Sequence, residues 1–193
     1  MAPSFIYRFV VMLALFIAWV GQAQAGVTIH YEGRAKSPAA VNNALSLLTA
    51  RARVLGWRAE DASGKNVSLT RVIDEKDVPY HGPVRGVVLW PGQNSEPLYV
   101  QFDSALFVQD FVKTQFAGPD VHIKVIELLR QLKPFFVDFK VEDEGEYWET
   151  NDRQQLEKHI DKVNSLIQEM KGKTPGLKGP ITLPNGRIVD LMR

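Results

Sequence analysis

Residues 27–56, VTIHYEGRAKSPAAVNNALSLLTARARVLG, hold the strand and the helix that decide the fold class. Apolar and polar side chains alternate over residues 27–31, which is typical of a strand with one buried face. Ser37 and Pro38 then predict a helix start, because serine caps helix N-termini and proline fits the first helical position. Apolar residues recur at helical spacing as far as Gly56, where we expect the helix to end.

The rest of the chain mixes both kinds of element. Alternation or apolar runs predict strands over residues 67–73, 84–90, 98–103 and 137–142. Helical spacing predicts helices over residues 107–112, 121–132 and 152–172. An irregular polar loop is expected through Pro79, Gly82 and Pro83. Pro184-Asn185-Gly186 predicts a terminal hairpin.

The order of these elements predicts the architecture. We expect an α+β fold with a single mixed or antiparallel sheet and helices mostly on one face. Strand-helix-strand occurs twice, which fits a split βαβ (ferredoxin-like) plan with a C-terminal helix and hairpin. That plan hosts many unrelated activities, so it says nothing about function.

The amino terminus resembles a secretory signal. Arg8 precedes an apolar run over residues 9–20, and Ala23-Gln24-Ala25 supplies the small residues that a signal peptidase recognises. Twelve apolar residues are too few for a membrane span, which needs roughly 17 to 25. We therefore expect a cleaved signal peptide over residues 1–25 and a single soluble domain over residues 26–193, periplasmic or secreted, without a later membrane span.

Composition limits the classes of partner. The 23 basic and 22 acidic residues nearly balance, whereas a nucleic-acid-binding protein usually has a basic excess. We therefore expect no nucleic-acid partner. Cysteine is absent, so neither a disulfide nor a cysteine nucleophile is available. The sequence has no phosphate-binding glycine motif and no G-x-S-x-G elbow, so no cofactor is expected.

The densest polar cluster lies over residues 142–152, EDEGEYWETND. Closely spaced carboxylates can bind a cation or act as an acid and base pair, although the spacing does not match an EF-hand loop. Acidic residues there also suit the entry to the following helix. Loop aromatics favour a third interpretation, a partner-binding surface. The residues that we predict to bind are Glu144, Glu146, Tyr147, Trp148 and Glu149.

The histidines offer a weaker catalytic hypothesis. None of the four has the short spacing of a zinc site, so no metal site is expected. His30 and Glu32 share one face of the first strand, and His81 or His122 could join them if the fold brings it near. Together with acids from the loop at Glu142, they would form a His/carboxylate site. No catalytic residue is assigned.

These features favour a non-catalytic function. We expect an exported protein that binds a protein partner in the cell envelope, and an immunity or inhibitor-type protein is one concrete form of such a binder. The alternative is a periplasmic hydrolase that uses a His/carboxylate site with or without a divalent metal.

Overall fold

The first strand and helix form as the sequence predicts. A computed structural model describes residues 26–193, in which β1 (Thr28–Ala35) leads into α2 (Pro38–Leu55). The Ser37 hydroxyl accepts a hydrogen bond from the Ala40 N–H over 3.1 Å. Gly56 ends the helix with a φ of 70°, a left-handed conformation that glycine adopts without steric cost. The signal peptide expected over residues 1–25 lies outside the described residues.

Two three-stranded antiparallel sheets form the centre of the fold. One has the order β2-β5-β6 and the other the order β7-β1-β8. These strands are β2 (Arg58–Asp61), β5 (Arg85–Trp90), β6 (Leu98–Phe102), β7 (Phe107–Lys113) and β8 (Phe136–Asp143). β6 and β7 follow one another as a hairpin, and the Asp103 N–H donates to the Phe107 carbonyl over 2.9 Å. Beyond that bond the two strands belong to different sheets, and we call the line between them the seam.

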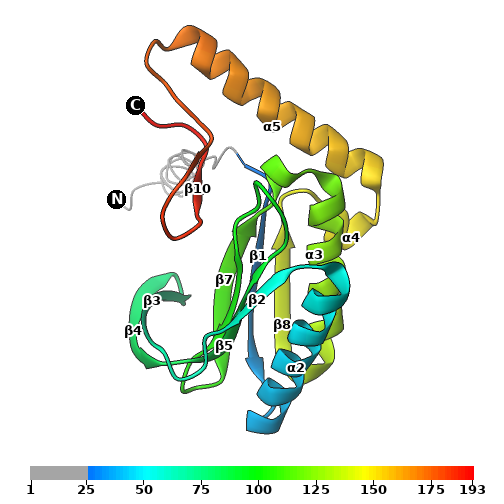
Figure 1. Ribbon diagram of the computed structural model, residues 1–193, viewed down its shortest axis with the longest axis vertical. Coiled ribbons are helices and arrows are strands. Elements are labelled where there is room, and N and C mark those ends of the chain that lie inside the picture. Colours follow the sequence, from blue (N-terminus) through cyan, green and yellow to red (C-terminus); the bar gives the residue numbers. More distant parts are fainter. Residues whose placement is uncertain (1–25) are drawn as a thin grey trace, which may run out of the picture.

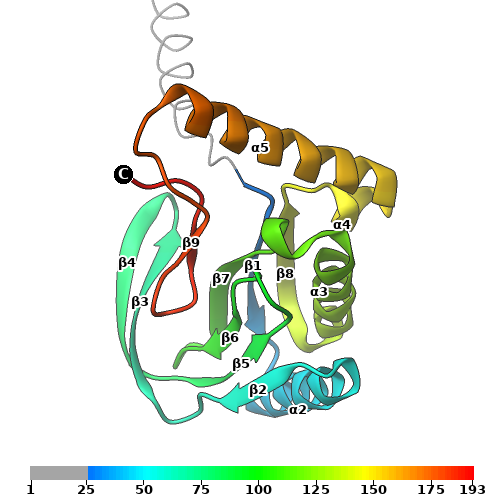
Figure 2. The same cartoon turned by 45° about the horizontal axis from the view of Figure 1, so that its top comes forward.

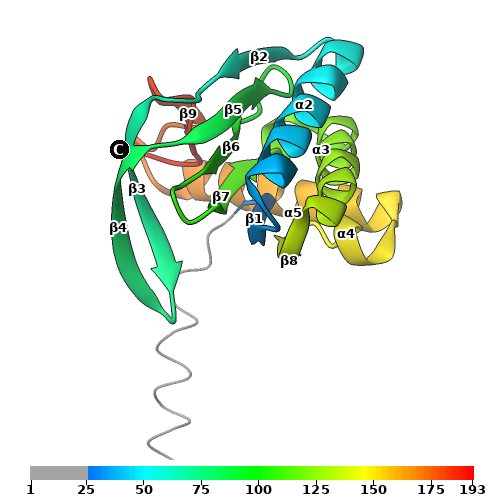
Figure 3. The same cartoon turned by 90° about the horizontal axis from the view of Figure 1, so that it is seen from below.

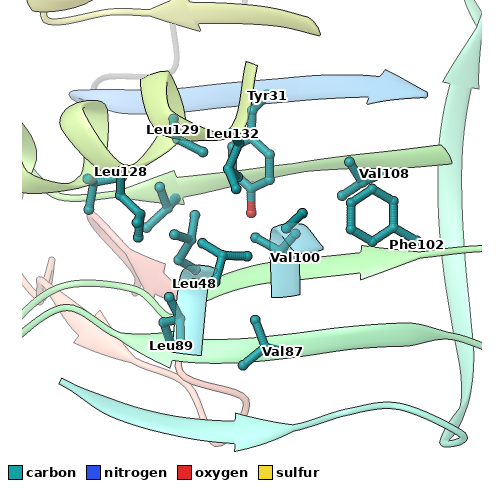
Figure 4. Close-up of a cluster of buried hydrophobic side chains, with 14 of the residues drawn as sticks. Tyr31, Leu48, Val87, Leu89, Val100, Phe102, Val108, Leu128, Leu129 and Leu132 are labelled. Atoms are coloured by element: carbon teal, nitrogen blue, oxygen red, sulfur yellow. The ribbon is translucent and has the colours of Figure 1, made fainter. Parts of the chain in front are cut away.

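Helices cover one face of these sheets. α2 and α3 (Pro119–Leu132) lie on the same side, opposite the two hairpins formed by residues 66–83 and 181–189 (Figure 1). Short 3-10 turns, η1 (Gln115–Ala117) and η2 (Lys133–Phe135), flank α3. Apolar side chains from both sheets meet those of the two helices in the core, where Leu48 and Leu129 have no exposed surface (Figure 4). Burial of this layer is the main stabilising contribution that the fold offers.

A long hairpin covers part of the opposite face. β3 (Asn66–Ile73) and β4 (Lys76–Pro83) pair in antiparallel register and lie between β2 and β5 in the chain. We call residues 66–83 the arm, which runs along the face opposite the helices (Figures 2 and 3). The prediction of an irregular loop through Pro79, Gly82 and Pro83 is therefore wrong. The two prolines oppose Thr70 and Asn66, positions where β4 does not need to donate to β3.

The chain ends in helices and a second hairpin. These elements are α4 (Tyr147–Thr150), α5 (Arg153–Lys173), β9 (Ile181–Thr182) and β10 (Ile188–Val189). The Asp152 carboxylate caps α5 by accepting from the N–H groups of Gln154 and Gln155. β9 and β10 pair around the predicted turn, so the terminal hairpin is confirmed.

The fold class agrees with the prediction from the sequence, but the arrangement of the strands in sheets differs from it. The α+β class is confirmed, and every strand pair described over residues 26–193 is antiparallel. The prediction of a single sheet is wrong, because these strands form two three-stranded and two two-stranded sheets, and the ferredoxin-like plan is not confirmed. The helix predicted over residues 107–112 is wrong, because these residues form β7. No helix within residues 26–193 has the length and apolar character that a membrane crossing requires.

Candidate binding groove

The face of β7-β1-β8 that points away from the helices carries ordered rows of polar and aromatic side chains. In the register, His30 of β1 lies between Phe111 of β7 and Glu142 of β8. Glu32 likewise lies between Gln109 and Lys140. Cross-strand partners share a face of the sheet, so these side chains form the floor of a common surface.

A cavity of about 1050 Å³ lies over this floor. We call it the groove. β3 residues 68–72 form one wall, and Trp148 lies at the β8 side. Its volume is slightly above the range of about 300–1,000 Å³ that is usual for ligand pockets.

Gln109 attaches the arm to the floor. The Val72 N–H donates to Gln109 Oε1 over 2.6 Å, and Gln109 Nε2 donates to the Val72 carbonyl over 2.9 Å. The same Nε2 donates to Glu32 Oε2 over 2.7 Å. One side-chain amide therefore supplies the bonds that a neighbouring strand would make and also orients a carboxylate of the floor.

Arg71 enters the seam from the arm. Its guanidinium donates to the carbonyl of Gln109 over 2.6 Å and to that of Gln101 over 3.1 Å. Asp103 lies 3.6 Å from Nε, close enough for an ion pair but too far for a hydrogen bond. Burial lowers the pKa of Arg71, and the charge of Asp103 opposes that shift. The arginine thus donates to carbonyl oxygens of β6 and β7 where these two strands are not paired with each other by backbone hydrogen bonds.

Arg187 occupies the other part of the seam, from the C-terminal hairpin. It donates to the Phe111 carbonyl over 2.7 Å and to Glu96 Oε2 over 3.1 Å, and it bonds Asp110. Its guanidinium lies 4.1 Å from the ring centroid of Phe111, within cation–π range. Burial raises the pKa of Asp110, although the charge of Arg187 opposes the shift. Glu96 also accepts from the Ile188 N–H over 2.7 Å, so this carboxylate bonds both Arg187 and the backbone of the terminal hairpin.

The loop predicted to bind a partner folds back largely onto the protein. Glu144 accepts a hydrogen bond from the Thr28 N–H over 2.8 Å, and burial raises its pKa. Glu146 bonds Gln155, and Glu149 is exposed in the turn of α4. These three acids do not line the groove, and their carboxylates are not brought together in it.

The two loop aromatics differ in position. Both are half-buried against the core, and Arg130 donates to their carbonyl oxygens, over 3.1 Å for Tyr147 and 2.8 Å for Trp148. Trp148 lines the groove, whereas Tyr147 packs against Val27 and Leu156 and does not. Of the five residues predicted to bind, Trp148 is the one that reaches the groove.

The residues of the His/carboxylate hypothesis are partly brought together. His30, Glu32 and Glu142 line the groove. His81 lies on the arm, where its Nδ1 is 3.0 Å from Ser68 Oγ, and it lines a separate hollow of about 340 Å³. Within residues 26–193, no three histidine or acidic side chains are grouped so that they could hold a metal ion.

A buried trio that the sequence analysis did not identify fixes the position of Trp148. His122 Nδ1 lies 2.8 Å from Thr114 Oγ1, and His122 Nε2 lies 3.1 Å from Asp143. Asp143 also accepts from the N–H groups of Gly145 and Trp148, over 2.8 and 2.9 Å.

The electrostatics of this trio favour an ionised Asp143. Burial by itself raises its pKa, but the hydrogen bond and charge of His122, with the two N–H donors, lower it overall. The threonine-histidine-aspartate order resembles that of a hydrolase triad. Since Thr114 and His122 have no exposed surface, no substrate reaches them, and we assign the trio a structural role. In the sequence, the signal for this trio is a histidine, His122, near the start of a predicted helix.

Comparison of the chain with protein-family models, with curated proteins and with solved structures finds no significant match, so the groove is interpreted on its geometry.

Proposed function

We propose that this protein is an exported, non-catalytic binding protein and that the groove receives a segment of a protein partner in the cell envelope. The single observation that carries the proposal is the groove itself, a cavity of about 1050 Å³ between a strand edge and a polar, aromatic sheet face. An inhibitor or immunity protein is one form that such a binder takes.

The hydrogen bonds that connect the wall and floor of the groove support binding. Gln109, Arg71 and Arg187 each tie one element of its wall or floor to another through hydrogen bonds. A site whose side chains are already ordered loses little conformational entropy when a partner binds. Trp148, held by Asp143 and Arg130, supplies a large aromatic surface at the rim, of the kind enriched in interface hot spots.

The envelope location rests on the amino terminus. The charged, apolar and small-residue order over residues 1–25 is that of a secretory signal. The expected mature terminus is Gly26, which mass spectrometry of the protein recovered from cells would detect.

A charge reversal in the groove tests the proposal. Glu142→Arg changes an exposed groove side chain, and Glu127→Arg makes the same change on α3, on the opposite side of the sheet. After chemical cross-linking in an envelope extract, a partner should be recovered with the wild type and with Glu127→Arg but not with Glu142→Arg. Equal recovery with both variants would rule out the groove as the binding site.

The chain allows a second, independent test because it has no cysteine. Cysteine introduced at Glu142 or at Glu127 can be coupled to a bulky maleimide at one chosen position. Blocking position 142 should prevent partner capture, and blocking position 127 should not.

One observation favours the hydrolase alternative, namely that His30, Glu32 and Glu142 line the same cavity. Glu32 is already engaged by Gln109 and Lys140, which leaves His30 as the candidate base. Hydrolysis of an ester or peptide panel by the wild type, abolished in His30→Ala with the fold intact, would favour this alternative.

A further inference from the structure

We infer that the edge of β3 facing the groove is a docking edge for an extended segment of the partner, which adds to the arm as a strand and places a lysine or arginine near Glu142. This inference rests on the proposed function, because it specifies how the groove would hold its partner. Strand addition to a free sheet edge is a common mode of peptide recognition.

The hydrogen bonds of Val72 show which backbone groups of β3 face the groove and which face β4. In an antiparallel pair, the N–H and C=O of one residue point to the same side, and the side alternates along the strand. Both groups of Val72 bond Gln109 rather than β4. The register of β3 with β4 has no shift over residues 66–73, so the backbone groups of Thr70 and Ser68 also point away from β4. Both residues line the groove.

The prolines of β4 agree with this direction. Pro79 lies opposite Thr70, and a proline has no N–H to give to a strand partner. It can occupy this position only because the pair Thr70 and Pro79 exchanges no backbone bonds. The outer edge of β4 is therefore interrupted by proline, which discourages pairing there, whereas the inner edge of β3 is not.

The inner edge is only partly satisfied. Within residues 26–193, the Gln109 amide bonds the backbone groups of Val72, and no side chain is found on those of Thr70 or Ser68. A strand beside β3 would lie about 4.8 Å away and advance about 3.3 Å per residue, so about three residues would span positions 68 to 70, next to the Gln109 amide that occupies Val72. Gln109 shows that a planar amide fits this edge.

The charges of the groove select the chemistry of the segment. Glu32 is paired with Lys140 over 3.2 Å, and Asp110 is paired with Arg187. Within residues 26–193, no hydrogen bond or ion pair is found for the exposed carboxylate of Glu142. β7 and β8 lie two strand spacings apart, about 10 Å, so a cation entering beside β7 needs a long side chain to reach Glu142. Lysine and arginine have such side chains.

Two variants at one position test the strand addition. Thr70→Pro removes the N–H that faces the groove without removing a bond to β4, and Thr70→Val keeps that N–H as the matched control. Both should retain the circular dichroism spectrum of the wild type. The probe is a library of random dodecapeptides displayed on phage and selected against residues 26–193.

Selected peptides should carry lysine or arginine in an extended, proline-poor segment. Their affinity should fall about tenfold with Thr70→Pro, the scale of one lost backbone hydrogen bond that leaves its partner unpaired. It should fall similarly with Glu142→Arg and hardly at all with Thr70→Val or Glu127→Arg.

Other outcomes overturn the inference in distinguishable ways. Peptides that lose affinity with Glu142→Arg but not with Thr70→Pro would leave the groove as the binding site and exclude strand addition. An empty selection, or peptides insensitive to both changes, would exclude the docking edge, while the cross-linking experiment would still decide the proposed function. Concentration-dependent dimers that Thr70→Pro abolishes would identify the occupant as a second copy of the chain and refute a separate partner segment.

Discussion

The side-chain amide of Gln109 forms two hydrogen bonds with the backbone of Val72, one donated in each direction, over 2.6 and 2.9 Å. A single residue of the floor therefore attaches the arm to β7, and Arg71 adds a second attachment one residue earlier in β3. The groove keeps its shape because these two contacts hold the arm in place.

Replacement of Gln109 by alanine should loosen the arm. The change removes both hydrogen bonds to the backbone of Val72 at an exposed position where water can replace them, and it should cost about 0.5–1.5 kcal/mol of unfolding free energy. Gln131→Ala, at a partly exposed position of α3, should cost less than about 0.5 kcal/mol. Hydrogen exchange measured by NMR should speed up at the Val72 amide in the first variant alone. Unchanged exchange at Val72 would mean that the arm does not depend on Gln109.

The core between sheet and helices should respond to truncation at Leu129. Leu129→Ala removes a side chain with no exposed surface and should cost about 2–5 kcal/mol. Lys158→Ala, on the exposed face of α5, should stay within about 0.5 kcal/mol. Urea unfolding curves measure both. Equal losses would show that the assigned helix faces are wrong.

Acid should destabilise the loop that Asp143 organises. Because the folded-state pKa of Asp143 is lowered from its ordinary value of 3.8, its contribution is complete above that value and is lost as the pH falls through the lowered pKa. Melting temperatures measured from pH 6 to pH 2 should decline for the wild type. Asp143→Asn should start from a lower melting temperature and decline less, and parallel curves for the two proteins would contradict this assignment.

Glu144 should show the opposite dependence. Burial raises its folded-state pKa, so its charged form opposes folding at neutral pH and protonation relieves that cost as the pH falls through the raised pKa. Glu144→Gln keeps an oxygen that can accept from the Thr28 N–H. The unfolding free energy of the variant, relative to that of the wild type, should therefore be higher at pH 7 than at pH 4. Denaturant titrations at the two pH values measure this difference, and a reversed order would contradict it.

The two loop aromatics should separate binding from stability. Trp148→Ala should weaken partner capture by about thirtyfold, the scale of an interface hot spot. Tyr147→Ala should chiefly lower the melting temperature, because Tyr147 packs against the core outside the groove. Pull-down affinity and thermal melts on the same preparations distinguish the effects. If Tyr147→Ala abolished capture while Trp148→Ala did not, the binding surface would lie outside the groove.

Much of the fold could be predicted from local pattern, and the exceptions have physical causes. Residues 107–113, FVQDFVK, place Phe, Val and two polar residues in an order that repeats every four positions and so imitates a helix. The two polar residues, Gln109 and Asp110, interrupt the apolar pattern because they bond Val72 and Arg187 from opposite faces of a strand. Only tertiary structure reveals those partners.

The candidate site shows the same limit. The sequence indicated that His30 and Glu32 share a face, because that follows from strand periodicity. It could not reveal that Glu142 lies beside His30, since the register between β1 and β8 joins residues more than a hundred positions apart. It also placed Glu144 among the binding residues, whereas Glu144 is half-buried and bonded to the Thr28 backbone.

The position of β1 in the middle of its sheet has a consequence for how the chain folds. Its two partners, β7 and β8, begin at Phe107 and Phe136, so every ladder hydrogen bond of β1 closes a long loop. Contacts of this kind slow folding. During synthesis, one edge of β1 stays open until residue 143 has emerged, and an open strand edge can pair with another chain. The interval before β8 is available is therefore when a newly made chain is most exposed to aggregation.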